Sequence, residues 1–355
     1  MKQTPTHSGA KQRILALDYL RGFFITVIII DHLWRWPNLF SLMSGRGELW
    51  ASAAEGFVII SGLLVGYVRG YKNRTQPLGV VSKKLVMRGV MLYIWMIITS
   101  LALVSVSWLL SFKGNMAYVP IPAGDWQTLI TSILRTDYVH TLTHFLYLYA
   151  IFLGVSPLAI WMLRQGKAWG VAIISAALWG WGFWQGIEWM QWQVLFFVPA
   201  IAGYYLDALF DAYYRLSATA RKTIRFGSIG LTAITIAIAA AIILPHEPGT
   251  YQETLFGRDP VTLATIIISF VWFLGLLSLF QLILPWLTRW FGWLLLTFGE
   301  RSLTAYILHT VPLVICQVFF AESNNLWLNT ILTAACIIAT WGLLKIPRIN
   351  RVIPR

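Results

Sequence analysis

The stretch that decides the fold is Leu17-Asp18-Tyr19-Leu20-Arg21-Gly22-Phe23-Phe24-Ile25-Thr26-Val27-Ile28-Ile29-Ile30-Asp31-His32. It is apolar enough to cross a bilayer, yet it holds four acidic or basic side chains. A charge inside a membrane costs roughly 2.5–3.5 kcal/mol, so it is retained where it faces a bundle interior, a partner or water. On a helix, Arg21 and His32 lie about 16 Å apart along the axis and nearly on one face. We therefore expect them to line one passage at two depths.

The two acidic residues of this stretch occupy different positions around the expected helix. Asp18 falls on the same side as Arg21, one turn earlier, so a structural ion pair between them is an alternative to a functional role for Arg21. Asp31 is rotated by about 100° from His32, since adjacent helix positions do not face each other. A dyad of Asp31 and His32 within one regular helix is therefore not expected.

The composition is typical of a polytopic membrane protein. The 355 residues are 58% hydrophobic and 12% charged, whereas soluble domains contain about 25% charged residues. No polar linker separates two domains, so we expect one transmembrane domain over residues 1–355, with tails at 1–13 and 346–355. Cys316 and Cys336 lie in apolar stretches, which favours packing over a disulfide or a metal site. The sequence contains no nucleotide-binding glycine loop, HExxH, GxSxG or zinc-spaced cluster, so we expect no metal.

Hydropathy predicts an all-α protein with about ten transmembrane helices. A window of about 20 apolar residues per span places them near 15–34, 49–69, 87–111, 141–163, 168–185, 192–210, 226–245, 262–284, 302–320 and 326–345. The fifth is rich in Trp and Gly, and the stretch from Trp290 to Phe298 is a candidate for a short interfacial helix. The first span lacks a cleavage site and is expected to be retained.

Basic residues set the expected orientation. With both termini in the cytoplasm, the cytoplasmic segments hold 21 Lys and Arg, the outer loops hold five, and Arg21 completes the total of 27. This asymmetry is a positive-inside signal, so we expect a multi-pass protein of the cytoplasmic membrane. The net charge of +13 is explained by these loops and by anionic lipid rather than by nucleic acid, which we exclude as a partner. The densest basic segment, from Arg69 to Arg88, is a topogenic loop or a landing site for an anionic ligand.

Several other polar residues are expected near the outer surface. Glu55 lies at a depth similar to that of His32. It is followed by Gly62 and Gly66, whose spacing allows a close helix contact, so a hydrogen bond to a neighbouring helix is an alternative to function. For each remaining candidate a packing or solvated role is the alternative: these are His140, His144, Glu188, Gln191, Gln193 and His309.

At these residues the chain resembles the OpgC family of membrane acyltransferases and, more distantly, the acyltransferase-3 family. The spacing of Arg21 and His32 matches the family signature of Arg or Lys, ten residues and His. Three further stretches resemble family stretches in the same order, so the resemblance spans nearly the whole chain. They are Ala53-Ala54-Glu55-Gly56-Phe57-Val58-Ile59-Ile60-Ser61-Gly62, Trp192-Gln193-Val194-Leu195-Phe196-Phe197 and Gly299-Glu300-Arg301-Ser302-Leu303-Thr304-Ala305-Tyr306-Ile307-Leu308-His309.

The resemblance implies transfer of an acyl group, succinyl or acetyl, from cytosolic acyl-CoA to a hydroxyl of an extracytoplasmic glycan. It implies that His32 is the general base, with Asp31 and Glu55 in the catalytic group. The donor would contact Arg21, Lys83, Lys84 and Arg88, and the acceptor would contact His144, Gln193 and His309. The chain departs from the family pattern at 141–144, where a more acidic stretch is usual, and this leaves the acceptor open. The oligomeric state is also open.

Two other functions remain possible from the sequence. One is N-acetylation of an amino sugar, as in the related heparan acetyltransferases. The other is secondary transport, which also places charges in the membrane but often shows an internal repeat of spans. No convincing repeat is visible in the sequence.

Overall fold

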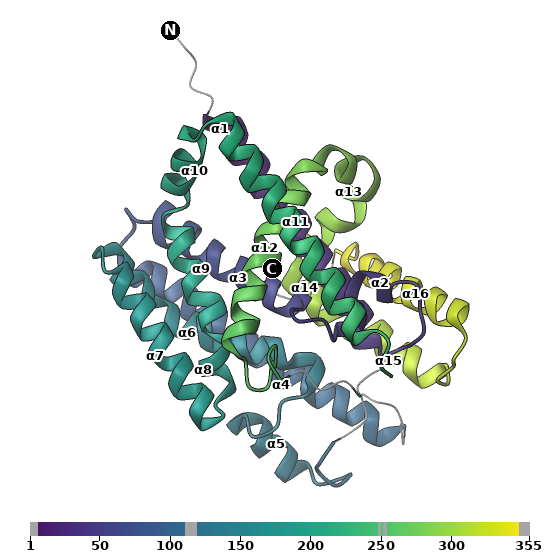
Figure 1. Ribbon diagram of the computed structural model, residues 1–355. Helices are drawn as coiled ribbons and strands as arrows, with labels where there is room; N and C mark the ends of the chain where they lie inside the picture. The colour runs from purple at the N-terminus through teal and green to yellow at the C-terminus, as the bar shows by residue number, and fades with distance from the viewer. Residues whose placement is uncertain (1–5, 111–118, 248–249, 251–253, 348–355) are drawn as a thin grey trace.

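A computed structural model describes residues 6–110, 119–247, 250 and 254–347, with backbone only for residues 6–14 and 42. The described residues form helices, with one isolated bridge between Arg258 and Val261 and no strand, which confirms the all-α prediction. Figure 1 shows their arrangement. The α-helices are α1 Thr6–Leu33, α2 Ser41–Ser44, α3 Ala53–Leu64, α4 Leu78–Leu109, α5 Trp126–Arg135, α6 His144–Arg164, α7 Ala168–Gln185, α8 Glu188–Trp192, α9 Val194–Tyr204, α10 Leu206–Arg215, α11 Ala218–Ile243, α12 Leu263–Leu282, α13 Leu284–Glu300, α14 Ser302–Leu308, α15 Thr310–Phe319 and α16 Leu326–Leu344.

Seven helical segments of the described chain are long and apolar enough to cross a membrane. An eighth is present if α8, α9 and α10 form one span, which bends by 65° before Leu206. Even when this bent segment is counted, two of the ten expected spans are missing from the eight. They correspond to α1, which carries Asp18, Arg21 and Asp31, and to α7. The multi-pass character is thus supported, while the number ten and the cytoplasmic termini stay predictions.

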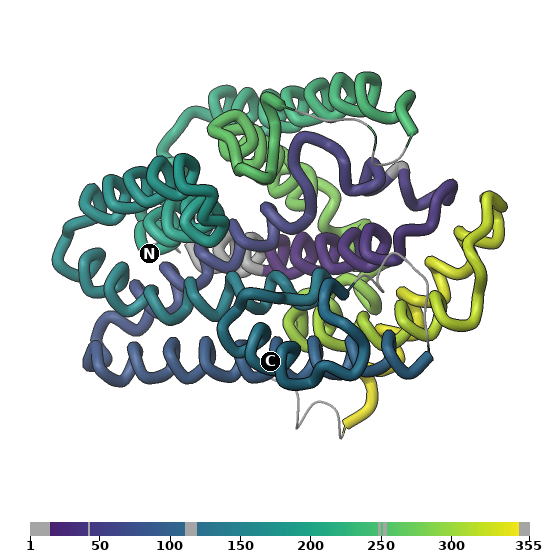
Figure 2. The backbone as a smooth tube through the Cα atoms, turned by 90° about the horizontal axis from the view of Figure 1, so that it is seen from below, coloured from purple at the N-terminus to yellow at the C-terminus, as the bar shows by residue number. Residues whose placement is uncertain are grey.

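Helix α1 lies in the interior of the bundle. It packs against α3, α12, α13, α14, α15 and α16, and Figure 2 shows it flanked on several sides by later helices. The contact with α13 is close because Gly22 has no side chain: a Cβ there would lie 1.9 Å from the carbonyl oxygen of Leu295. The expected short helix at 290–298 is therefore part of a 17-residue helix that supports α1.

The predicted close contact at Gly62 and Gly66 is also present. Each glycine meets the backbone of α9, at the carbonyl oxygens of Phe196 and Ala200 respectively. Helix α3 continues into a π-helix, η2 Val65–Lys72. Cys316 and Cys336 are buried and free, as the sequence predicted. The close packing of α1, α3 and α9 fixes the positions of the polar side chains described next.

Candidate active site

Arg21 and His32 lie on one face of α1, as their spacing predicts. Helix α14 packs against α1. Its first residue, Ser302, contacts Arg21, and His309, which follows its last residue, contacts His32. The Arg21 Nη2 donates a hydrogen bond to Ser302 Oγ, and its guanidinium lies 5.8 Å from the centre of the Phe57 ring. Asp18 is 3.9 Å from Arg21 Nη1, so the expected ion pair is present but loose. We call the surface formed by Arg21, Ile25, Ile28 and His32 the Arg21 face.

At the other end of this face, His32 is hydrogen-bonded to His309. The His32 Nδ1 and His309 Nε2 atoms are 2.8 Å apart, and His309 has no exposed surface. The His309 Nδ1 contacts the carbonyl oxygen of Tyr306. A carbonyl can only accept, so His309 carries its proton on Nδ1 and accepts at Nε2 when neutral. His32 then donates from Nδ1, and its Nε2 keeps a free electron pair.

This assignment of protons comes from the hydrogen-bond network, since imidazole tautomers follow the bonds that each nitrogen makes. Among the hydrogen bonds of the described residues, His32 takes part through Nδ1 and not through Nε2. A histidine held in this way is suited to accept a proton from a hydroxyl group that approaches Nε2. His309 is placed to orient His32, and its predicted role as a substrate ligand stays a prediction.

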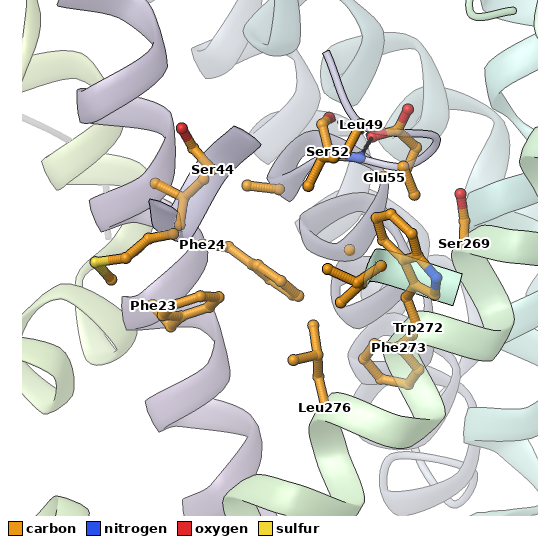
Figure 3. Close-up of a pocket in the computed structure, with 16 residues that line it drawn as sticks. Phe23, Phe24, Ser44, Leu49, Ser52, Glu55, Ser269, Trp272, Phe273 and Leu276 are labelled. Atoms are coloured by element: carbon orange, nitrogen blue, oxygen red, sulfur yellow. Dashed lines mark hydrogen bonds between the residues drawn. The ribbon is translucent and has the colours of Figure 1, made fainter. Parts of the chain in front are cut away.

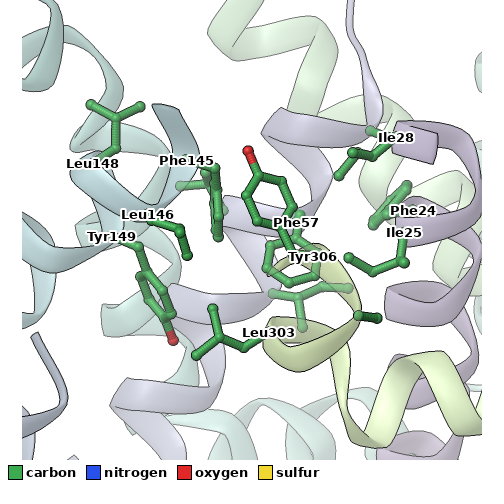
Figure 4. Close-up of a cluster of buried hydrophobic side chains, with 14 of the residues drawn as sticks. Phe24, Ile25, Ile28, Phe57, Phe145, Leu146, Leu148, Tyr149, Leu303 and Tyr306 are labelled. Carbon is green, nitrogen blue, oxygen red and sulfur yellow. The ribbon is translucent and has the colours of Figure 1, made fainter. Parts of the chain in front are cut away.

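Buried apolar side chains fill the space between Arg21 and His32. Figure 4 shows Ile25 and Ile28 of α1 facing Phe57 of α3 and Tyr306 of α14, with Phe145 of α6 behind them. The His32 and Tyr306 ring centres are 6.2 Å apart. A molecule that passes from Arg21 to His32 has to part these side chains.

Arg88 of α4 is close enough to Arg21 to act on it electrostatically, and so is Tyr149 of α6. Two like charges that share a buried region repel each other more strongly than in water. The Nε atoms of both arginines are buried and have no hydrogen-bond partner. Buried donors without partners are costly, so this pair favours an anionic group between them. Lys83 and Lys84, by contrast, are exposed on α4.

Asp31 and Glu55, which the family resemblance assigns to the catalytic group, lie in another part of the structure. Glu55 is 1% exposed, and its Oε1 lies 3.0 Å from the Nε of Arg258. Its Oε2 accepts from the backbone of Ser52, which caps α3 in return. This reciprocal capping box satisfies two donors at the helix start. Figure 3 shows Glu55 at the edge of a cavity lined by Phe24 and Trp272.

Asp31 follows Phe23 and Val27, which line this cavity, along α1, but it does not line the cavity itself. Its carboxylate faces Ser44 and approaches Gly47, where a Cβ would be 3.3 Å from Oδ2. Arg258 donates to the carbonyl oxygens of Gly47 and Leu49, which anchors the segment before α3. We call the surface formed by Phe23, Val27 and Asp31 the Asp31 face. Neither Asp31 nor Glu55 contacts His32 in the described structure.

His144 and Gln193, the other two predicted contacts of the acceptor, are hydrogen-bonded to other residues of the chain. The Nε2 of His144 lies 2.8 Å from Glu188 Oε2 on a partly exposed surface. Gln193 is 1% exposed, and it binds Ser175 through both its side-chain oxygen and nitrogen. This contact joins α7 to the start of α9. The structure therefore does not bring His144 or Gln193 to His32, and their role as substrate ligands stays a prediction.

Two residues of the site, Ser302 and Tyr306, were not predicted from the sequence, whereas His309 was. Ser302, Tyr306 and His309 follow a spacing of four and three, which places them on one face of a helix, so a pattern was available. His140, expected to be solvated, is only 4% exposed, and its Nδ1 accepts from the backbone of Leu142. It lies near enough to His32 to act on it electrostatically. Among the described residues, no group of three His, Cys, Asp or Glu side chains is placed to hold a metal ion.

Comparison with known proteins gives one match. A family model described as OpgC protein matches residues 13–347, which is more than nine tenths of the chain. No curated protein and no solved structure matches the chain. The matched region contains Arg21, Arg88, His32 and His309.

Proposed function

The chain belongs to the OpgC family, which implies acyltransferase activity, and we propose that it transfers an acyl group from cytosolic acyl-CoA to a hydroxyl of an extracytoplasmic glycan. The proposed acyl group is succinyl or acetyl. Each part of this reaction requires a different feature of the Arg21 face: a base, an anion site and a path between them.

His32 is the proposed general base. Its Nε2 removes the proton of the acceptor hydroxyl while that oxygen attacks the thioester carbonyl carbon. A carbon–oxygen bond forms, the carbon–sulfur bond breaks, and the proton passes from His32 to the departing thiolate of CoA. The observation that carries this assignment is the contact between His32 and His309, because it leaves Nε2 as the hydrogen-bond acceptor.

Arg21 and Arg88 form the proposed anion site for the donor. An arginine guanidinium is a strong ligand for phosphate oxygens, and both Nε atoms lack a partner. Arg21 and His32 are eleven residues apart, or about 16 Å, a length comparable to that of an extended phosphopantetheine arm. With a phosphate at Arg21, the thioester would reach His32 after the arm parts Phe57 and Tyr306. Lys83 and Lys84 would act as an exposed landing surface.

Asp31 and Glu55 take no part in the proposed chemical step. Both are directed to the segment anchored by Arg258, and the structure offers no contact between them and His32. His144, with its partner Glu188, remains a proposed contact for the acceptor on the outer surface.

Two measurements test the proposed function. Purified protein in vesicles is incubated with acetyl-CoA or succinyl-CoA, and release of free CoA is followed in the presence of envelope glycan. Mass spectrometry of envelope glycans from cells with and without the gene then identifies the added group. A glycan mass shift that disappears with the gene supports the proposal. Unchanged glycans, together with no CoA release, would favour a transporter.

A further inference from the structure

Two short loops meet beyond the end of α1 and enclose a cavity with polar walls. One loop is 34–36, which follows α1, and the other is 322–324, which joins α15 to α16. The cavity has a volume of about 180 Å³, so it can hold more than a single water molecule. A smaller cavity of about 60 Å³ lies beside it and shares Trp34, Arg35 and Glu322. We call the two spaces together the Trp34 cavity.

Buried side chains hold the two loops against each other. The guanidinium of Arg35 donates to backbone carbonyl oxygens at the end of α15, including that of Ala321 at 2.8 Å. The Nδ2 of Asn329, a fully buried residue of α16, donates to the carbonyl oxygens of Pro37 and Ser323 at 3.0 and 2.8 Å. The cavity is therefore formed before a ligand enters, and binding does not have to order these loops.

Trp34 presents a large aromatic ring at this cavity. Its backbone φ of 52° lies in the left-handed region, which is rare for a bulky residue, and 49% of the residue is exposed. Strained backbone of this kind concentrates at binding sites. Trp36 lines the same cavity and is half-buried. The face of an indole ring is flat, apolar and electron-rich, so the C–H bonds of a sugar ring can stack on it.

The walls also contain hydrogen-bond acceptors that are not in use. Glu322 is exposed, and among the described residues its carboxylate forms no ion pair and no hydrogen bond. The Oε1 of Gln317, which lines the smaller space, is buried without a hydrogen-bond partner in the described structure. A buried acceptor without a donor is costly. A ligand that carries hydroxyl groups can donate to both side chains.

The charges around the cavity favour a neutral ligand. Arg35 and Glu322 are the two charged residues of its lining. The guanidinium of Arg35 already binds backbone carbonyl oxygens, so an anion would meet the Glu322 carboxylate without a free cation to balance it. A cation would meet the buried charge of Arg35. Neutral hydroxyl groups avoid both conflicts, because they can donate to Glu322 and accept from the exposed amide of Asn324.

We propose that the Trp34 cavity binds a neutral sugar unit of the acceptor glycan. The sugar ring stacks on Trp34, and its hydroxyl groups donate to Glu322 and Gln317. Trp34 follows His32 by two residues, and His32 is partly exposed, so a longer oligosaccharide held here presents a hydroxyl of a neighbouring sugar to His32. This inference rests on the proposed function and adds a binding site for the acceptor to it.

The test measures binding separately from acyl transfer. Full-length protein in lipid nanodiscs is titrated by calorimetry with unacylated oligosaccharides from the envelope of cells that lack the gene. Trp34→Ala should weaken binding by about tenfold, because it removes the stacking surface, and Trp34→Tyr, which keeps a ring, should restore most of the affinity. Glu322→Ala should weaken binding by about fivefold through the loss of an acceptor.

A matched control separates the cavity from the aromatic residues that are common at membrane interfaces. Trp327 is 65% exposed at the start of α16 and does not line the cavity, so Trp327→Ala should bind oligosaccharide like the wild-type protein. The proposal is overturned if the wild-type protein does not bind, if Trp34→Ala binds equally well, or if Trp34→Ala and Trp327→Ala lose the same affinity.

Kinetic measurements distinguish a failure of this site from a failure of the proposed function. Trp34→Ala should raise the KM for the oligosaccharide and leave the KM for acyl-CoA unchanged. Binding that depends on Trp34 supports the cavity even when the protein releases no CoA, although the proposed transfer would then be wrong. Transfer by Trp34→Ala with an unchanged KM for the oligosaccharide would overturn the cavity and leave the proposed function in place.

Discussion

On α1, the Arg21 face and the Asp31 face both carry acidic or basic side chains, but their partners differ in kind. On the Asp31 face, Glu55 and Arg258 pair with each other, and Arg258 also holds the backbone before α3. On the Arg21 face, Arg21 makes only a loose ion pair with Asp18, at 3.9 Å. Among the described residues, Arg88 has no ion pair and His32 is hydrogen-bonded through Nδ1 alone.

This difference separates a structural arrangement from a reactive one. A buried ion pair anchored by a capping box holds a loop in place, and its groups have little freedom to bind a substrate on the His32 side. Two arginines that share one loosely held carboxylate, together with an oriented histidine, are arranged for an anionic ligand that binds later. The position of α14 beside α1 creates the second arrangement, because it places Ser302 at its start and His309 directly after its end.

Of the variants that distinguish the two faces, His309→Ala should lose the most activity. His309→Ala removes the acceptor for His32 Nδ1, so His32 can adopt the tautomer with its proton on Nε2. The turnover number should fall by up to about 10²-fold, which does not exceed the loss expected for His32→Ala, because His309 acts through His32. His309→Gln, whose side-chain oxygen can accept the same hydrogen bond, should restore part of the loss. Equal activity of His309→Ala and the wild type would show that His309 does not orient His32 for catalysis.

A second prediction addresses the Asp31 face through stability. Arg258→Gln leaves the Glu55 carboxylate buried without its partner, which costs about 3 kcal/mol when a buried pair is broken. The free energy of unfolding should fall by this amount in a detergent-solubilised denaturation experiment. The correctly folded fraction should keep its turnover number. A stable variant with a lost turnover number would instead place Arg258 in the reaction.

A third prediction concerns the donor. Arg21→Gln should raise the KM for acyl-CoA by about tenfold with a smaller change in kcat, because contacts present in both ground and transition states affect KM. If Arg21 only neutralises Asp18, the single variant would be unstable and Asp18→Asn would restore both stability and donor affinity. Thermal unfolding and donor titration of the single and double variants distinguish the two roles.

The smallest effects are expected near the N-terminus of α4. Arg88→Gln should raise the KM for acyl-CoA less than Arg21→Gln does, because the remaining arginine still binds the anion. Lys84→Gln, at an exposed position of the same helix, should change KM by less than about twofold, since exposed ion pairs contribute little. If Lys84→Gln raised the KM for acyl-CoA more than Arg88→Gln did, the anionic part of the donor would bind at the exposed surface of α4 and not beside Arg21.

The sequence predicts the periodic features of this protein well. Hydropathy identifies the apolar helices, the helical angle places Arg21 with His32 and apart from Asp31, and Gly62 with Gly66 indicates a close helix pair. These predictions depend on local geometry alone. The pairings of His32 with His309, and of Glu55 with Arg258, join residues more than 200 positions apart. They are set by how α14 and the segment before α12 pack on α1 and α3, which a single sequence does not specify.

The central claim is that His32 acts as the base of an acyl transfer, and a matched pair of histidine variants tests it most directly. His32→Ala and His246→Ala, the latter at an exposed position after α11, are purified and assayed for acyl transfer from acyl-CoA to envelope glycan. We predict that His32→Ala inserts normally and loses at least about 10²-fold in turnover, while His246→Ala keeps wild-type activity. A well-inserted His32→Ala protein with activity close to that of His246→Ala would contradict the account.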